Sequence, residues 1–297
     1  MKKRAAAMVL ASFAADALAL GAHWIYDTAV IDDKIGRVDR LRQPAPDSFH
    51  HTKAAGDFTH YGDQTLVLLS SVAECRGFDL DHFARSWQGL FRDYAGYRDH
   101  ATRETLQNFA EGKSPAAAGS ASTDLGGAVR IAPLAYLYRD QRDELLSAAR
   151  VQTAMTHNNP IVLESADLLA DLLWHVLKGD SPTAALKTAS AGRTALTKLI
   201  ADGLRSAGRP TRDTIKGFGQ MCETTAALPG VIHLVVTYEN DLKTALVENV
   251  MAGGDSAARG MAVGMILGAH LGHAAIPAEW LNDLKADKRI RDLLDRI

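Results

Sequence analysis

Residues 4–20 place the strongest constraint on the fold, because this run is rich in alanine and leucine and contains neither proline nor glycine. Such a run favours a helix that is apolar on every side, and a helix of this kind is stable when other helices surround it. A second small-residue segment carries Gly260, Gly264 and Gly268 at intervals of four. Residues four apart share one helix face, so this spacing predicts close helix packing in a core rather than a membrane dimer motif.

The remainder of the chain shows helical patterning with few exceptions. Residues 21–62 are rich in glycine, proline and histidine, which predicts a long and mostly irregular segment of the kind that often carries function. Residues 231–240 resemble a strand, but one short run cannot support a sheet, and a helix remains the alternative. No repeat or linker divides the chain, so we predict one compact all-α domain over residues 1–297. Further helices are predicted at residues 64–75, 80–95, 100–111, 128–140, 142–155, 160–178, 182–205, 211–227 and 277–297.

The composition argues against several classes of protein. With 47% hydrophobic and 23% charged residues, the 297 residues can bury a large core. The net charge of −2 gives no sign of a nucleic-acid surface or of a polybasic membrane patch. Lys2, Lys3 and Arg4 precede an apolar run in the manner of a signal peptide, but Asp16 interrupts this run. We predict that it belongs to the fold, and that no uninterrupted apolar run is long enough to span a bilayer.

The two cysteines, Cys75 and Cys222, are far apart in the sequence. Neither lies in a spacing typical of a zinc site or of a disulfide framework. We therefore predict a reduced protein of the cytoplasm.

Three segments share one design, in which glycines and a short acid stand at the start of a helical stretch. They are "HYGDQT" at residues 60–65, "STDLGGAVR" at 122–130 and "MAGGDSAARG" at 251–260. Glycines let backbone amides approach a ligand closely, and helix N-termini favour anions. If Asp63 and Asp255 were brought together, the two turns could hold a hard cation between them, because such cations prefer oxygen ligands.

Five motifs in order resemble those of the ADP-ribosylglycohydrolase family, which includes a crystallin-like branch. The matching segments are "ADALA" at 15–19 followed by Gly21, "GDQT" at 62–65, "GGAVRIAP" at 126–133, "TH" at 156–157 and "GGDSAA" at 253–258. Together they cover nearly the whole chain. The resemblance implies an all-α fold in which active members place two magnesium ions in a central cleft. Those members cleave the glycosidic bond between ADP-ribose and its acceptor.

The two turns that supply metal ligands in the family are altered in this chain. Gly62 and Gln64 stand where the family has threonine and a second aspartate, and Ala257 and Ala258 stand where it has aspartate and threonine. Two magnesium ions carry four positive charges and need several carboxylates around them. We therefore expect at most one Mg²⁺ ion, or none. Its ligands would be Asp63, Asp255, the carbonyl oxygen of Gln64, Ser256 and water.

The predicted site residues follow from these motifs. The predicted catalytic residues are Asp63, Asp255 and His60, and the predicted metal ligands are Asp63 and Asp255. The predicted substrate-binding residues are Asp16, Asp124, Gly126, Gly127, His157, Gly253, Gly254 and Ser256.

Simpler interpretations stay open for most of these residues, and Gly126 and Gly127 could be ordinary helix-start glycines. Asp63, Asp255 and Ser256 could be helix caps, and Asp16 could make a structural hydrogen bond. His157 could be an ordinary helix-terminal histidine. Loop histidines are often solvated, which is the alternative for His50, His51 and His60, although His23 and His60 are the best-placed candidates for a new acid–base group. Trp24 and Tyr61 could stack on a base or sugar, or pack in the core.

Two functions are compatible with these observations. The first is a divergent hydrolase that cleaves a glycosidic bond in an ADP-ribosyl or related nucleoside or sugar substrate. The second is a catalytically inactive ADP-ribose-binding or crystallin-like protein that kept the fold and lost the two-metal chemistry. The expected partner is a small molecule or an ADP-ribosylated substrate, with no nucleic acid and no membrane.

Overall fold

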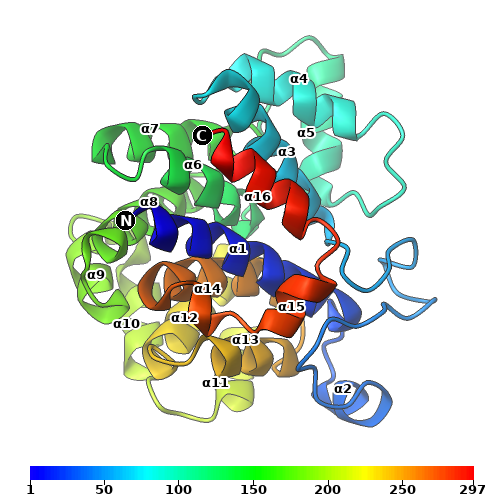
Figure 1. Ribbon diagram of the computed structural model, residues 1–297, viewed down its shortest axis with the longest axis vertical. Helices are drawn as coiled ribbons and strands as arrows, with labels where there is room; N and C mark the ends of the chain where they lie inside the picture. The colour runs from blue at the N-terminus through cyan, green and yellow to red at the C-terminus, as the bar shows by residue number, and fades with distance from the viewer.

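The chain folds into sixteen α-helices and five short 3-10 helices, and no strand is formed (Figure 1). The computed structural model describes residues 1–297, and one continuous cluster of buried hydrophobic side chains joins helices from both ends of the chain. The predicted all-α fold is thus confirmed. The α-helices are α1 (Lys2–Ala19), α2 (Thr28–Lys34), α3 (His60–Cys75), α4 (Leu80–Leu90), α5 (His100–Ala110), α6 (Ala132–Leu137), α7 (Arg142–Ala154), α8 (Pro160–Lys178), α9 (Pro182–Ala189), α10 (Thr197–Arg205), α11 (Thr211–Phe218), α12 (Thr224–Thr237), α13 (Leu242–Met251), α14 (Ser256–Leu271), α15 (Ala278–Asp283) and α16 (Asp287–Asp295).

Helices α1 and α14 lie side by side at the centre of the molecule (Figure 1). The glycines of α14 face the alanines of α1 so closely that no larger residue fits. A Cβ atom on Gly264 would lie 2.5 Å from the carbonyl oxygen of Ala11, and one on Gly268 would lie 2.6 Å from the Cβ of Ala11. The predicted close helix packing is therefore what holds this pair together.

The two central helices run antiparallel, and both ends of the pair are fixed by hydrogen bonds. At one end Arg4 donates to the carbonyl oxygens of Ala269 (2.8 Å) and His270 (2.7 Å), which caps the C-terminus of α14. At the other end the amide of Trp24 donates to the carbonyl of Gly254 (2.9 Å). The end of α1 is thereby brought to the start of α14.

Residues Lys2–Ala22 form a helical stretch that is long and apolar enough to cross a membrane by length and composition. The expectation that no run reaches this length was therefore wrong, because α1 and the following 3-10 helix η1 (Leu20–Ala22) continue past Asp16. In the fold, 94% of the most apolar window of this stretch is buried. It is the central core helix, in agreement with the prediction that the run belongs to the fold.

Several predicted helix boundaries were wrong. The stretch 182–205 forms two helices, α9 and α10, because Gly192 adopts a positive φ of 79° between them. The stretch 211–227 is divided after Phe218, where Gly219 has φ 105°. The strand-like run after residue 230 belongs mostly to α12, in agreement with the helical alternative, because burial among helices overrides its β-branched composition.

A matched pair of substitutions tests the α1–α14 contact. Gly264→Ala should lower the free energy of unfolding by about 2 kcal/mol, since the added methyl group meets the backbone of α1. Gly89→Ala, at an exposed site in α4 where a Cβ meets no atom within 4 Å, should raise it by about 0.5–1 kcal/mol. Urea unfolding measures both, and equal effects would contradict the proposed packing.

Candidate functional site

A cavity of about 460 Å³ opens where several helices begin. Its wall includes the aromatic rings of Trp24 and Tyr97, whose centroids lie 4.8 Å apart. Acidic side chains from different elements also line it, among them Asp99 and Asp124. Other surface cavities of similar volume, such as the one between Asp202 and Phe218, do not adjoin a buried pair of carboxylates.

The loop that carries Asp124 is fixed by backbone pairing with a distant segment. An isolated antiparallel bridge joins Asp124 to Glu223, with hydrogen bonds from Leu125 N to Cys222 O (3.0 Å) and from Thr224 N to Thr123 O (2.8 Å). This pairing places Cys222 beside Asp124, although the two residues are far apart in the sequence.

Tyr61 joins two buried carboxylates that also cap helices. Its hydroxyl lies 3.0 Å from Oδ2 of Asp124 and 2.8 Å from Oδ2 of Asp255. Asp124 accepts from the amide of Gly126 (2.7 Å) at the start of the 3-10 helix η2 (Leu125–Gly127), and Asp255 accepts from the amide of Ala258 (3.1 Å) at the start of α14. Burial raises the pKa of both carboxyls, and the charge of Asp255 raises that of Asp124 further.

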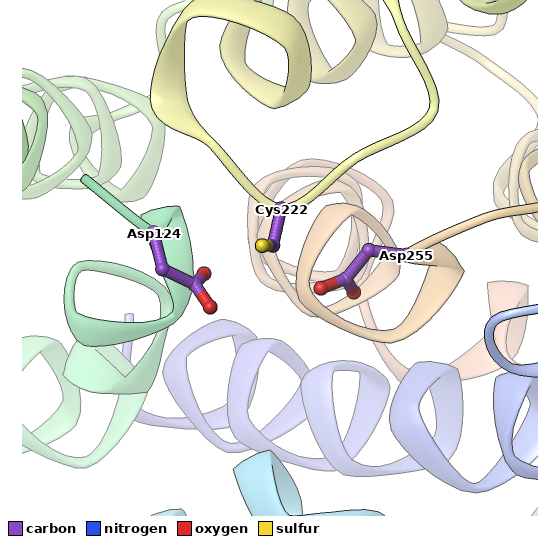
Figure 2. Close-up of side chains that lie close together, drawn as sticks. All are labelled: Asp124, Cys222 and Asp255. Carbon is purple, nitrogen blue, oxygen red and sulfur yellow. The ribbon is translucent and has the colours of Figure 1, made fainter. Parts of the chain in front are cut away.

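Cys222 completes a group of three potential metal ligands. Figure 2 shows Asp124, Cys222 and Asp255 pointing toward one another from three separate elements. One ligand atom of each residue lies within 4.8 Å of those of the other two. The thiol is half-buried and lines the cavity. The structure therefore contains a small group that could hold one metal ion.

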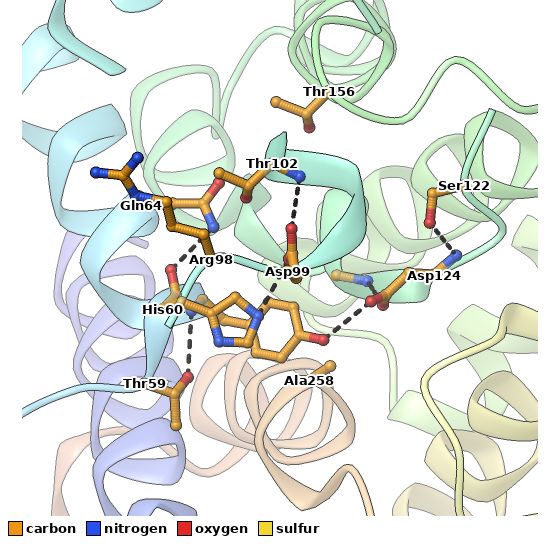
Figure 3. Close-up of polar contacts among 12 residues, drawn as sticks. Thr59, His60, Gln64, Arg98, Asp99, Thr102, Ser122, Asp124, Thr156 and Ala258 are labelled. Atoms are coloured by element: carbon orange, nitrogen blue, oxygen red, sulfur yellow. Dashed lines mark hydrogen bonds and ion pairs between the residues drawn. The ribbon is translucent and has the colours of Figure 1, made fainter. Parts of the chain in front are cut away.

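On the other side of the cavity, Asp99 pairs with His60 (Figure 3). Nε2 of His60 lies 3.1 Å from Oδ2 of Asp99, and Asp99 also accepts from the amide of Thr102 (2.6 Å) as the cap of α5. Burial alone would raise the pKa of Asp99, but the hydrogen bond and charge of His60 outweigh it and hold this pKa well below its usual range. The same pairing raises the pKa of His60 against its own burial.

The start of α3 is set by Asp16 and Thr59. Asp16 accepts from the amide (2.8 Å) and the hydroxyl (2.5 Å) of Thr59, and the hydroxyl of Thr59 accepts from the amide of Tyr61 (3.2 Å). The helix cap is therefore Thr59, and α3 begins at His60, four residues before the predicted start. Asp16 is fully buried and holds this turn in place, in agreement with the structural alternative for this residue.

Asp63 points to a different part of the molecule. Its carboxylate contacts the ammonium of Lys53 and the hydroxyl of Tyr94, and it lines a separate cavity of about 330 Å³. No hydrogen bond or ion pair joins Asp63 to Asp255, and the potential metal group does not include it. The predicted cation between Asp63 and Asp255 therefore gains no support from the structure, in which a lysine already balances the charge of Asp63.

The side chain of Gln64 is also held by hydrogen bonds inside the protein. Its Oε1 accepts from Trp87 Nε1 (2.8 Å) and Arg130 Nη1 (2.7 Å), which uses both of its lone pairs. It is therefore not free to bind a cation, contrary to the predicted ligand set. With Lys53 on Asp63 and Arg130 on Gln64, the first turn does not fit the pair of magnesium ions that the family resemblance implies.

Gly126, Gly127 and His157 lie together, and the space that the glycines leave is filled by protein side chains. A Cβ on Gly126 would lie 2.3 Å from the ring of Tyr61, and one on Gly127 would lie 2.6 Å from the ring of His157. His157 is buried, and its Nδ1 is 2.9 Å from the hydroxyl of Thr156. These residues support the floor of the site and do not line the cavity.

Gly253 and Gly254 form the turn before α14, with φ values of 73° and 68°. Arg259 donates to the carbonyl of Gly253 (2.7 Å), and the amide of Asp255 donates to the carbonyl of Gln220 (2.8 Å). The turn thus fixes Asp255, while the buried hydroxyl of Ser256 has no hydrogen-bond partner.

Sequence reasoning missed Asp99 and Cys222. Asp99 directly precedes the predicted helix at 100–111, so its role as a helix cap could be predicted. Nothing in the sequence placed it beside His60. Cys222 reaches the site only through the backbone pairing with the loop of Asp124. Of the loop histidines, His50 is buried among Trp24, His23 and His60, whereas His51 is exposed.

Comparison with known proteins agrees with this architecture. The sequence model of the ADP-ribosylglycohydrolase family matches residues 1–297, and the chain belongs to that family. A solved structure described as an ADP-ribosylglycohydrolase-related protein complex superposes with a TM-score of 0.74 at 25% identity, covering 99% of this chain and 96% of that one.

Relatives by sequence include two crystallins. Crystallin J1A of Tripedalia cystophora is 24% identical over 313 residues, covering 95% of this chain and 92% of the relative. Crystallin J1B of the same organism is 23% identical and covers 100% and 97%. An uncharacterized protein of Archaeoglobus fulgidus is 25% identical over 247 residues, covering 82% and 80%.

The buried Gln64 network can be tested by removing its acceptor. Gln64→Leu should lower the free energy of unfolding by about 3 kcal/mol, because the buried donors of Arg130 and Trp87 lose their partner. Gln107→Leu, on the exposed face of α5, should change it by less than about 0.5 kcal/mol. Denaturant unfolding measures both, and similar stability of the two variants would refute the network's role.

Acid sensitivity of the fold should depend on His157. Burial lowers the pKa of His157 to about 3, helped by the charge of Arg130. Because the unfolded chain binds this proton below about pH 6.5 and the native protein does not, stability is lost as the pH falls below about 6.5.

His157→Asn, which can still bond to Thr156, should remove about 1.4 kcal/mol of the stability lost between about pH 7.5 and about pH 5.5. Urea unfolding at the two pH values measures this loss. An unchanged loss in the variant would show that His157 titrates normally in the native protein.

Proposed function

We propose that this protein is a hydrolase that cleaves a glycosidic bond of an ADP-ribosyl or related nucleoside substrate. The proposal rests on one observation, namely that two buried carboxylates on different helix starts, Asp99 and Asp124, open into the same cavity. Enzymes that hydrolyse glycosidic bonds commonly place a carboxylate on each side of the bond. Membership of the ADP-ribosylglycohydrolase family supports the same class of reaction.

Asp99 is the group that we assign to accept the proton of the attacking water. Its pairing with His60 and Thr102 keeps it ionised and fixes its orientation. A proton acceptor must be both ionised and held within reach of the water, and the cap position at α5 provides both conditions. His60, which sequence reasoning offered as a catalytic residue, acts here as the partner that positions Asp99.

Asp124 lies on the other side and is assigned to the leaving-group side of the bond. Tyr61 and the amide of Gly126 hold its carboxylate in place. Trp24 and Tyr97 supply aromatic surfaces on which a planar base or the face of a sugar can pack. The expected partner is therefore a small molecule or a modified side chain carrying ADP-ribose. A separate part of the proposal is that the protein is cytoplasmic.

We propose fewer metal ions for this protein than the two that the family resemblance implies. The altered first turn does not fit a second ion, so at most one cation is proposed, at the group of Asp124, Cys222 and Asp255. A bound cation would supply positive charge beside the sugar hydroxyls. The roles of Asp99 and His60 do not depend on it.

A non-catalytic role is the second candidate, favoured by the crystallin relatives and by the lysine that neutralises Asp63. In that case the cavity would bind ADP-ribose without turnover, or the fold alone would matter. Turnover separates the two candidates.

The decisive experiment replaces the proposed base. Asp99→Asn keeps a helix-capping side chain but cannot accept the proton, so hydrolysis of ADP-ribosylated substrates should fall at least about 100-fold. Release of ADP-ribose measures the rate, and circular dichroism checks the fold. The matched control is Asp79→Asn, at the exposed cap of α4, which should leave the rate unchanged.

Calorimetric titration of ADP-ribose with Mg²⁺ and with EDTA completes the test. Binding in either buffer together with turnover supports the hydrolase, and binding without turnover supports the non-catalytic alternative. A fully active Asp99→Asn variant would refute the assignment of Asp99. No binding and no turnover would rule out an ADP-ribosyl substrate.

A further inference from the structure

The hydrogen bonds around Tyr61 show that Asp124 and Asp255 need one more proton or cation between them. Tyr61 has one hydroxyl proton, but its oxygen lies within hydrogen-bonding distance of both Asp124 and Asp255. One hydroxyl can donate to only one carboxylate. If both were ionised, the second contact would set two oxygens against each other, so a proton or a cation must be present at this point.

No side chain of the protein supplies that charge directly. Arg259 donates to the side-chain oxygen of Asn249 (3.1 Å) and to the carbonyl of Gly253 (2.7 Å) and makes no hydrogen bond to either carboxylate, although its charge acts on Asp255 from a distance. Lys53 is paired with Asp63, in the other cavity. The carboxylates are thus buried with no lysine or arginine in hydrogen-bond contact, which is costly unless another cation binds.

An independent observation comes from His23. Its side chain is fully buried, and neither ring nitrogen has a hydrogen-bond partner. Nδ1 lies 3.9 Å from Oδ1 of Asp255, so the imidazole lies beside one member of the same group. Buried polar atoms are nearly always satisfied, so the unpartnered imidazole beside Asp255 is free to serve as a metal donor.

We propose that Asp124, Cys222 and Asp255 bind one thiophilic divalent cation of the zinc type, and that the neighbouring His23 ring, which lies outside this group of three, shifts to become the fourth donor. The donor set decides the class of metal, because sulfur and imidazole favour zinc-like ions, whereas Mg²⁺ prefers oxygen ligands only. On binding, the Cys222 thiol loses its proton to solvent, as does any protonated carboxyl of the pair. The half-exposed thiol at the cavity wall provides the entry path.

The site differs from the one expected from the sequence, since it excludes Asp63 and gains a cysteine and a histidine. It deepens the proposed function, because the cation would lie on the leaving-group side of the cavity. It can nevertheless be tested without any substrate, so its failure and the failure of the hydrolase proposal are distinguishable.

Cobalt(II) reports directly on a cysteine ligand. The full-length protein, treated with chelator and dialysed, is titrated with Co²⁺ under reducing conditions. We expect one equivalent to bind with a thiolate-to-cobalt charge-transfer band in the near ultraviolet. Cys222→Ser should abolish the band, and Cys75→Ser, which changes the exposed second cysteine, should retain it.

Asp124→Asn and His23→Gln should weaken Co²⁺ binding at least about 10-fold. Absence of the band in the wild-type protein, or its persistence in Cys222→Ser, would overturn the proposal and leave a shared proton as the missing charge. If Cys222→Ser fails to fold, X-ray absorption of the zinc-loaded wild type decides the matter. One sulfur at about 2.3 Å from zinc supports the site, and a shell of oxygen and nitrogen alone refutes it.

Discussion

The close contact between α1 and α14 is the interaction on which the rest of the structure depends. Because glycines of one helix face alanines of the other, the backbones approach nearly to van der Waals contact, and the remaining helices pack around the pair. The antiparallel arrangement also positions the candidate site. It carries the end of α1, with Asp16 and His23, to the start of α14, where Asp255 caps the helix. The position of the site is thus a product of core packing.

The chemistry gathers at the beginnings of helices. Asp99, Asp124 and Asp255 each accept a backbone amide as a cap. The second oxygen of Asp99 lies against His60, and those of Asp124 and Asp255 lie against the hydroxyl of Tyr61. A helix N-terminus carries partial positive charge, which stabilises a carboxylate there. Burial acts in the opposite direction. The contact with His60 outweighs burial and holds the pKa of Asp99 low, whereas the pair Asp124–Asp255 needs a proton or a cation.

The sequence was sufficient for the helical class, for the central helix and for the glycine-mediated packing, because these features have local periodicity. It was insufficient for the site. The pairing of residues 222–224 with 123–125 is a single bridge without periodic pattern, so Cys222 could not be placed. The motifs drew attention to Asp124 and Asp255, which the structure brings together on Tyr61, but the orientation of Asp63 depends on Lys53 and Tyr94, which lie outside every motif. The side chain of Asp63 therefore points away from Asp255, although the motifs had suggested that these two acids lie together.

A capping carboxylate such as Asp99 both stabilises a helix and has a proposed chemical role, and this combination affects how the protein can evolve. Loss of a cap affects folding, and loss of charge would affect only the proposed chemistry, so a survey of variants by cellular abundance would rank Asp99 and the purely structural cap Asp79 alike. Asparagine satisfies the backbone at both positions and erases only the charge. A lineage could therefore abandon catalysis by single conservative steps while keeping the protein abundant. The same shape would then be available for a role in which concentration, rather than turnover, is selected.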